Sequence, residues 1–274
     1  MLTEATIESW LREDVGHHDV TNDVPGETTG RLVASESGVA AGIEAATRVF
    51  DALDADAEAL VAAGDSVEPG ETVLRATGRA RSVLRAERVA VNVAGHASGV
   101  ATLTREAVRR AATASDPPTV AATRKTTPGL RGVEKRAVAA GGGDTHRLGL
   151  SHMVMVKDNH VAELGLESAV ERLRARASFA TKVEVEAESP ETAARAADAG
   201  ADIVLLDNMD PETTRRAVRR TPEDVLTEAS GGIGIDEVET YAATGVDVVS
   251  LGSLTHGAPA LDYSFRTEGE AGPM

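Results

Sequence analysis

The sequence feature that most constrains the fold is an alternation of short apolar runs with longer stretches rich in Ala, Glu and Arg, from about residue 119 to residue 251. Strands that alternate with helices at spacings of roughly 20 to 30 residues predict a parallel sheet built from βα units. The run Ile203–Leu206 has no polar residue, as is typical of a parallel strand covered on both faces. Six units can close into a barrel or form an open doubly wound sheet, and the periodicity does not decide between them. The expected strands are 119–123, 153–156, 183–185, 203–206, 225–227 and 246–251.

The first 100 residues show a different pattern, in which short candidate strands are separated by Gly and Pro turns. This pattern predicts a separate α+β domain at 1–100, to which part of the C-terminal tail also belongs, with the second domain at 101–265. The tail 266–274 is polar, and we expect it to be frayed. The expected strands of the first domain are 31–38, 42–43 and 66–77, and its expected helices are 3–14, 45–53 and 79–101.

The composition excludes several classes of protein. The chain of 274 residues has a net charge of -16, which argues against nucleic acid or an anionic membrane as its partner. It has no cysteine, so thiolate chemistry and disulfides are excluded. No apolar run reaches the roughly 18 residues of a membrane span, and the first residues do not resemble a signal peptide, so we expect a cytoplasmic protein.

The balance of charged residues also suggests a halophilic protein. Only Lys125, Lys135, Lys157 and Lys182 are lysines among 28 basic residues, against 44 acidic ones. Such a surface is suited to concentrated salt, where screening weakens the repulsion between acids. An ordinary acidic protein from a GC-rich genome is the alternative.

Polar residues come directly after the expected strands of the second domain. In parallel α/β folds ligands bind at the carboxyl ends of the strands, so these residues indicate one site. A set of solvated loop charges is the alternative. The residues are Arg124, Lys125, Lys157, Asp158, Asn159, His160, Glu184, Glu186, Asp207, Asn208, Glu228, Ser230, Gly231, Gly232, Gly252 and Ser253.

A local basic segment lies within this acidic chain. Residues 121–160 contain seven basic and three acidic residues, with His146 and His152 among them. Guanidinium and ammonium groups in that number are suited to a small substrate with several carboxylates or phosphates. For Lys135 and Arg136, an exposed helix face is the simpler interpretation.

Two further patterns indicate where phosphate and metal would bind. The loops Ser230–Gly232 and Gly252–Ser253 come after the last two strands, where barrels commonly bind phosphate, although tight turns would need glycine too. Glu186 and Asp207 end adjacent strands and offer the oxygen ligands that Mg²⁺ prefers, although Val183–Glu186 also fits an edge strand with one wet face. The pair His17 and His18 does not have the spacing of a metal site.

Taken together, several motifs spread over residues 13 to 265 resemble the quinolinate phosphoribosyltransferase family, also called nicotinate-nucleotide pyrophosphorylase (carboxylating). The resemblance implies an N-terminal α/β sandwich followed by an incomplete parallel α/β barrel. The motifs are Glu13-Asp14-Val15-Gly16, Thr123-Arg124-Lys125-Thr126-Thr127-Pro128-Gly129-Leu130-Arg131, His146-Arg147, Lys157-Asp158-Asn159-His160, Val183-Glu184-Val185-Glu186, Leu206-Asp207-Asn208, Glu228-Ala229-Ser230-Gly231-Gly232 and Gly252-Ser253-Leu254-Thr255-His256.

The resemblance also implies a reaction, in which quinolinate and phosphoribosyl diphosphate give nicotinate mononucleotide, diphosphate and CO₂ in de novo NAD biosynthesis. Lys125, Lys157, Glu186 and Asp207 would be catalytic, and Glu186 and Asp207 would also face Mg²⁺. The substrates would be bound by Arg88, Thr123, Arg124, Lys125, His146, Arg147, Lys157, Glu186, Asp207, Ser230, Gly231, Gly232, Leu251, Gly252 and Ser253.

Arg88 lies in the N-terminal domain, so we expect a homodimer in which a partner subunit supplies it to a shared active site. Three alternatives remain at this stage. They are a nicotinate phosphoribosyltransferase, the pyrophosphorylase-like paralogue associated with molybdenum transport, and a non-catalytic phosphate-binding barrel.

Overall fold

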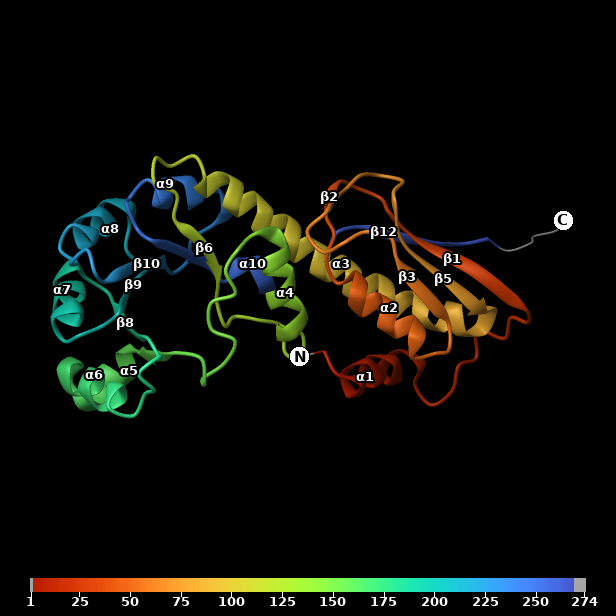
Figure 1. Cartoon of the computed structure of the whole chain (residues 1–274), viewed down its shortest axis with the longest axis horizontal. Helices are drawn as coiled ribbons and strands as arrows, with labels where there is room; N and C mark the ends of the chain where they lie inside the picture. Colours follow the sequence, from red (N-terminus) through yellow and green to blue (C-terminus); the bar gives the residue numbers. More distant parts are fainter. Residues whose placement is uncertain (1, 269–274) are drawn as a thin grey trace. The chain divides into compact units, whose positions relative to one another are not determined.

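The computed structural model describes residues 2–268 and divides into two compact units (Figure 1). The first unit holds the chain up to Arg105, the segment Thr127–Gly142 and the chain from Ala258 onward; the second holds Glu106–Thr126 and Gly143–Gly257. The expected boundary near residue 100 falls inside helix α3 (Ala80–Ala111). Residues 127–142, which the expected division assigned to the barrel, pack in the first unit.

The first unit is built on an antiparallel sheet with the strand order β12-β1-β5-β3. Its four strands are β1 (Glu27–Ala34), β3 (Asp56–Ala59), β5 (Thr72–Arg79) and β12 (Tyr263–Thr267), and a two-stranded sheet pairs β2 (Gly38–Val39) with β4 (Ser66–Val67). Helices α1 (Glu4–Val15), α2 (Ile43–Asp51), the first part of α3, and α4 (Arg131–Gly141) complete the unit.

Apolar side chains fill the core between this sheet and its helices. Leu32, Phe50, Leu74 and Val83 are fully buried, and the Phe50 ring stacks on Phe265 of β12 with the ring centres 5.5 Å apart. The alternation of Tyr263 and Phe265 with polar residues was the signal for β12. Residues 266 and 267 thus belong to a strand rather than a frayed tail, and residues 269–274 lie outside the described part of the chain.

Several expected elements of the first unit differ from those in the structure. Residues 42–43 do not form a strand, because Gly42 has a φ of 72° and caps α2. The expected strand 66–77 is two strands, and the first strand begins at Glu27 rather than 31. Helix α3 continues to Ala111, ten residues beyond its expected end at 101. Strand β3 was missed because its sequence, Asp-Ala-Glu-Ala, has weak strand propensity.

The second unit contains a parallel sheet whose six strands all match runs expected from the sequence. The strands are β6 (Thr119–Ala122), β7 (Val154–Val156), β8 (Val183–Ala187), β9 (Ile203–Asp207), β10 (Leu226–Ser230) and β11 (Val248–Leu251). The helical segments are α5 (Asp158–Leu164), α6 (Leu166–Arg174), α7 (Pro190–Asp198), α8 (Pro211–Val218), the 3₁₀ turn η1 (Ile235–Glu237), α9 (Val238–Ala242) and α10 (Ser253–His256).

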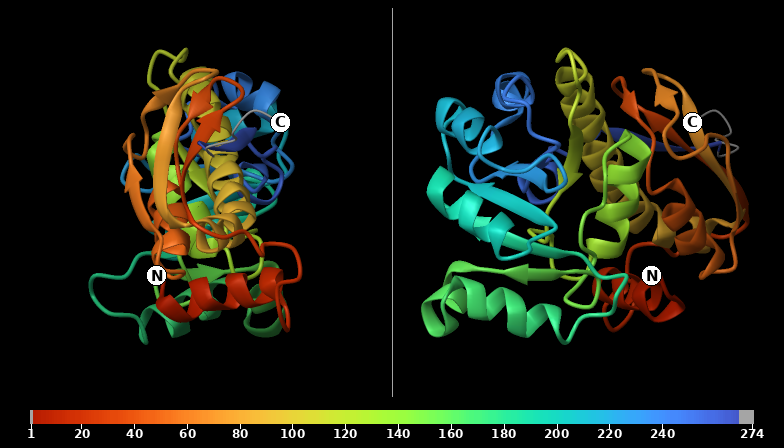
Figure 2. Two further views of the ribbon diagram at one scale, coloured as in Figure 1. Left: turned by 90° about the vertical axis from the view of Figure 1, so that its right-hand side faces the viewer. Right: turned by 60° about the vertical axis from the view of Figure 1, so that its left-hand side comes forward.

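The strand order β6-β11-β10-β9-β8-β7 decides between barrel and open sheet. From β7 to β11 each strand lies beside its predecessor, and β11 pairs with β6, which is the order of a barrel left open between β6 and β7. A doubly wound sheet would reverse direction. Helices α6 to α9 succeed one another along the outer side of this sheet (Figures 1 and 2). The expected fold class, an α/β chain with an incomplete parallel barrel, is confirmed.

Local sequence fixes where the outer helices begin. Ser189 accepts a hydrogen bond from the Thr192 amide at the start of α7, and Asp210 accepts from the Glu212 and Thr213 amides at the start of α8. A proline comes after each capping residue, at a position where its missing N–H costs nothing. The helices therefore start a few residues after β8 and β9, which leaves the loops at the carboxyl ends of these strands short. None of the helices within residues 2–268 is both long and apolar enough to cross a bilayer.

Candidate active site

A cavity of about 770 Å³ lies at the carboxyl ends of the barrel strands. The residues that line it come from strands β7 to β11, from the segments that follow β6, β7, β9, β10 and β11, and from the segment before β7, all within the second unit. The expected site residues that the structure brings together here are Thr123, Arg124, Lys125, His146, Arg147, Lys157, Glu186, Asp207, Ser230, Gly231, Gly232, Gly252 and Ser253.

Two expected residues do not line this cavity. Leu251 is buried in the core of the second unit, whereas its neighbours Ser250, Gly252 and Ser253 line the cavity. Arg88 lies on α3 in the first unit, where its side chain is 61% exposed and one guanidinium nitrogen is 3.7 Å from Glu87. The cavity is also lined by residues that were not expected to bind substrate, namely Met155, Leu205, Asn208, Glu228, Ile233, Gly234, Ser250 and His256.

Lys157 and Glu186 form an ion pair at the rim of the barrel. The Lys157 ammonium is 2.5 Å from Glu186 Oε2. Lys157 directly follows β7 and caps α5, where its amide donates to His160 Nδ1 at 2.9 Å. Because the lysine side chain is half exposed, the two charges are held at the surface of the cavity and can separate when a ligand offers each a new partner.

Asp207 lies at the end of the neighbouring strand. Burial, and then the negative charge of Glu186, raises the pKa of Asp207 above its ordinary value. The Asn208 amide group donates to Asp207 Oδ2 at 2.6 Å, and Asn208 itself has a φ of 54°. The two acids thus repel one another in this cavity, which favours a cation between or beside them.

The loops after β10 and β11 contribute backbone rather than charge. Gly231 has a φ of 94°, and a Cβ atom there would lie 2.6 Å from the Asn208 backbone nitrogen, so this position requires glycine. Ser250 donates to Ser230 at 2.9 Å and joins the two strands that carry the loops. At Gly252 a Cβ would lie 2.8 Å from Lys125 Cδ, so the missing side chain makes room for the lysine.

Lys125, which follows β6, is held in place by Thr255 of α10, the helix that follows β11. The Thr255 hydroxyl donates to the Lys125 carbonyl at 2.5 Å, and Thr123 accepts from the Lys125 amide at 3.0 Å. Beside Lys125, the Nε atom of Arg124 is buried and has no hydrogen-bond partner among the described residues; the same is true of Arg147 Nε. Two guanidinium groups at the cavity therefore have donors available for an anion.

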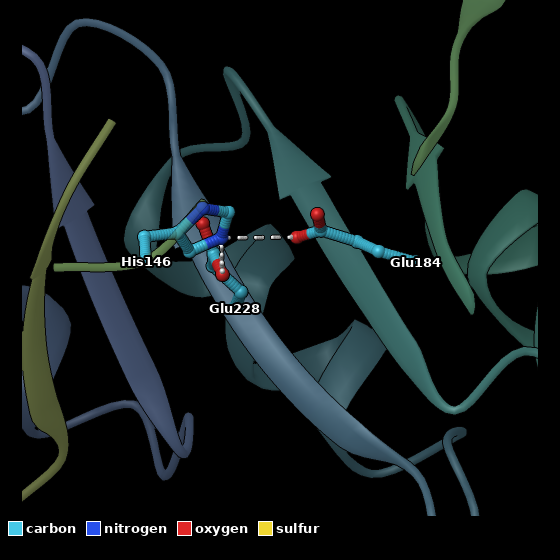
Figure 3. A group of neighbouring side chains, drawn as sticks. All are labelled: His146, Glu184 and Glu228. Carbon is cyan, nitrogen blue, oxygen red and sulfur yellow. Dashed lines mark hydrogen bonds and ion pairs between the residues drawn. The ribbon is translucent and has the colours of Figure 1, made fainter. Parts of the chain in front are cut away.

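A buried cluster of charges lies inside the barrel (Figure 3). His146 Nε2 is 3.1 Å from Glu228 Oε2 and 3.7 Å from Glu184 Oε1. Burial by itself lowers the pKa of His146, but Glu184 and Glu228 outweigh it and raise the pKa to about 9. His146 is therefore a cation at neutral pH.

The sequence placed Glu184 and Glu228 in one set of polar residues at the rim, but no pattern indicated that they would pair with His146 inside the barrel. Glu184 was compatible with an edge strand that has one wet face, but β8 lies between β7 and β9 and Glu184 is fully buried. A barrel has an inner face, so alternate residues of one strand point into it. The spacing of Glu184 and Glu186 placed both residues at the rim, with a wet-faced edge strand as the alternative, whereas Glu184 is buried inside the barrel.

His17 and His18 are exposed and take no part in this site. Among the described residues, the only group of three with the spacing of metal ligands is His146, Glu184 and Glu228. Asp19, next to the two exposed histidines, is instead paired with Arg85 at 2.7 Å.

Comparison with known proteins identifies the family. A family model described as the quinolinate phosphoribosyl transferase C-terminal domain matches residues 100–266, and the model of the N-terminal domain matches residues 18–98. The chain is 45% identical to a probable nicotinate-nucleotide pyrophosphorylase (carboxylating) from Methanothermobacter thermautotrophicus, over 96% of this chain and 98% of that protein. It is 41% identical to the nicotinate-nucleotide pyrophosphorylase (carboxylating) of Homo sapiens, over 96% of this chain and 90% of that protein.

A solved structure of NadC from Streptococcus pyogenes superposes with a TM-score of 0.88 at 39% identity, and the match covers 97% of both chains. The N-terminal and C-terminal family models match the chain one after the other, and the match to the first relative covers almost the whole of that protein. The chain belongs to the quinolinate phosphoribosyl transferase family.

Proposed function

We propose that this protein is a quinolinate phosphoribosyltransferase. It transfers the phosphoribosyl group of phosphoribosyl diphosphate to quinolinate and forms nicotinate mononucleotide, diphosphate and CO₂ in de novo NAD biosynthesis. The observation that carries the proposal is the pair of buried guanidinium donors without partners, on Arg124 and Arg147, at a cavity that His146, Lys125 and Lys157 also line. This set supplies more cations than one carboxylate can pair, and it suits a pyridine dicarboxylate together with a diphosphate.

The chemistry requires positioning more than proton transfer. The ring nitrogen of quinolinate forms a bond to C1 of the ribose while the bond from C1 to the diphosphate oxygen breaks, and diphosphate leaves with the electron pair. Positive charge develops on the ribose, so the carboxylates of Glu186 and Asp207 stabilise that face, while Lys125 and Lys157 stabilise the leaving anion.

Decarboxylation proceeds from the product of this transfer. The bond from ring C2 to its carboxylate breaks, CO₂ leaves, and the pyridinium nitrogen stabilises the electron pair that stays on C2 until a proton from water replaces the carboxylate. The cations of the cavity, in particular Arg124, His146 and Arg147, hold the two carboxylates so that nitrogen faces the ribose.

Glu186 and Asp207 fit a magnesium ion. They offer carboxylate oxygens at the ends of adjacent strands, and burial, followed by the negative charge of Glu186, raises the pKa of Asp207. When bound there, Mg²⁺ neutralises diphosphate charge. Lys157 pairs with Glu186 in this structure, so the lysine must turn toward substrate when the carboxylate turns toward the ion.

Two copies of the chain would form each active site. Arg88 is largely exposed and has one ion pair, at 3.7 Å, while every residue that lines the cavity lies in the second unit. A homodimer in which each subunit's Arg88 reaches the partner's cavity accounts for an exposed arginine that the family resemblance assigns to substrate. We also propose that the enzyme is cytoplasmic, because its sequence has no apolar run that could span a membrane, and that it is halophilic, because its composition is acidic and poor in lysine.

Product analysis tests the function. The purified protein is incubated with quinolinate, phosphoribosyl diphosphate and Mg²⁺, and the products are identified by mass spectrometry and CO₂ release. We expect nicotinate mononucleotide, diphosphate and CO₂ in equal amounts. If a parallel incubation with nicotinate in place of quinolinate gave nicotinate mononucleotide without CO₂, the protein would be a nicotinate phosphoribosyltransferase instead. If neither substrate were turned over, the result would favour the non-catalytic phosphate-binding barrel.

A further inference from the structure

His146, Arg147 and Glu228 form a partition inside the barrel. They line the active-site cavity and also a second cavity of about 360 Å³. The second cavity is otherwise lined by residues at the starts of strands, including Thr119, Lys182, Ile203 and Val248, so it lies toward the amino ends of the barrel. The three side chains therefore separate the two cavities and form the floor of the active-site cavity.

Two buried carboxylates converge on one nitrogen in this floor (Figure 3). Glu228 comes from β10 and Glu184 from β8, and both are almost completely buried. Their oxygens lie 3.1 Å and 3.7 Å from His146 Nε2, while neither oxygen of Glu184 has a hydrogen bond among the described residues. Buried carboxylates are costly unless a positive charge lies beside them, and here that charge is the imidazolium.

The backbone also holds His146 in place. His146 has a φ of 49°, in the left-handed region that few residues other than glycine adopt. Its amide donates to Asp144 Oδ1 at 2.6 Å, and Asp144 forms a parallel bridge with Ala121 of β6. Such a strained conformation persists only where its surroundings determine it, so the segment after α4 is built to aim this ring.

We propose that Glu228, together with Glu184, is a positioning residue for the transferase reaction: it fixes His146 as a permanent cation in the floor of the cavity, where His146 pairs with a carboxylate of quinolinate. The inference rests on the proposed function and deepens it. Glu228 does not touch the substrate in this account; it sets the charge and orientation of the residue that does.

The surrounding charges are compatible with this role. Arg147 and Asp144 flank His146 on its own segment, and Arg147 balances the second carboxylate of the cluster. His146 Nε2 already faces two carboxylates, so a metal ion would have to displace its proton. The other titratable groups that line the two cavities are Arg124, Lys125, His152, Lys157, Lys182, Glu186, Asp207 and His256.

The variant Glu228→Gln tests the proposal because it keeps the shape and removes the charge. With Glu228 present the pKa of His146 is about 9, whereas without its partners the ordinary value is 6.5. In the variant Glu184 remains, so the pKa of His146 falls below about 9 toward this ordinary value, and the imidazolium fraction decreases more at pH 8 than near pH 6. We expect the KM for quinolinate to rise by about tenfold or more at pH 8 and to approach the wild-type value near pH 6, while the KM for phosphoribosyl diphosphate stays the same.

Three controls separate this role from a merely structural one. Glu171→Gln, on the exposed face of α6, removes one negative charge elsewhere and should change neither KM. His146→Gln should raise the KM for quinolinate at both pH values, and adding Glu228→Gln to it should have no further effect. An NMR titration of the His146 ring without substrate should show a pKa that falls in Glu228→Gln.

The outcomes are distinct. A wild-type protein that does not turn over quinolinate contradicts the proposed function, while the NMR titration still tests the positioning of His146. A KM defect in Glu228→Gln that is equal at both pH values, with an unchanged titration of His146, overturns the inference. Stoichiometric binding of Zn²⁺ that Glu228→Gln abolishes would also overturn it, because the cluster would then be a metal site.

Discussion

Opposite charges are paired inside the barrel before any substrate arrives. His146 and Arg147 face Glu184 and Glu228 in its interior, and Lys157 faces Glu186 at the rim. These pairs keep an anion-binding cavity folded although its cations would otherwise repel one another. For Glu186 and Lys157, the sequence predicted that the side chains would lie at the carboxyl ends of their strands. The buried position of Glu184 could not be predicted, because a single strand pattern does not say which face is enclosed.

For the buried cluster around His146, we predict that the free energy of unfolding falls as pH rises. The pKa of His146 is about 9 in the folded protein and 6.5 ordinarily, so the folded state binds this proton more tightly. The stabilisation is then fully present below about pH 6.5 and is lost as pH rises through about 9. Burial also raises the pKa of Glu184, which acts in the same direction.

Calorimetry between about pH 6 and pH 9.5 checks this, since most other carboxylates stay ionised over that range. The melting temperature should decline across it in the wild type and decline less in Glu228→Gln. The same slope in both proteins would mean that His146 does not keep its proton through Glu228.

At the scale of elements, the site is made by the loops at the carboxyl ends of the strands. The six runs of the parallel sheet could be predicted because continuous apolar residues mark buried parallel strands, and caps such as Ser189 and Asp210 mark the start of the next helix. Part of the C-terminal tail was expected in the first unit, but helix α4 and the start of strand β12 were assigned to the barrel, because their places depend on contacts between residues far apart in sequence, such as Phe265 with Phe50. Local patterns do not contain that information.

The loop after β10 provides the prediction at this scale. Gly231→Ala would place a methyl group 2.6 Å from the Asn208 backbone nitrogen at a φ of 94°, so the loop must move. We expect the KM for phosphoribosyl diphosphate to rise by about tenfold or more, since the loop would no longer present its backbone to the phosphate.

The matched control is Gly149→Ala, where no atom lies within 4 Å of the added methyl group. It should leave the kinetics unchanged. If Gly231→Ala affected only the KM for quinolinate, the loop would not belong to the phosphoribosyl subsite.

At the scale of the whole molecule, charge and composition determine the conditions under which the chain folds. A net charge of -16 with four lysines leaves many surface acids to repel one another over the longer Debye length of dilute buffer. We therefore predict a melting temperature and activity that rise with KCl up to molar concentration. The same melting temperature in dilute buffer and in concentrated salt would show that the composition reflects the genome and not salt adaptation.

The shared active site gives a second prediction at this scale. Arg88→Ala and Lys157→Ala should each be nearly inactive, because each leaves a substrate anion without a charged partner, a loss of about 2–5 kcal/mol. When the two variants are refolded together, one site in each mixed dimer carries both residues, so activity should return. Mixed dimers that form but stay inactive would place Arg88 outside the partner's site.

A comparison of the specificity constants for quinolinate and nicotinate, with saturating phosphoribosyl diphosphate, shows whether this cavity is built for two carboxylates. Arg124, Lys125, His146, Arg147 and Lys157 line the cavity together, and nicotinate's single carboxylate cannot satisfy the buried guanidinium donors of both Arg124 and Arg147. We predict that kcat/KM for quinolinate exceeds kcat/KM for nicotinate by about a thousandfold or more. Comparable values for the two substrates would contradict it.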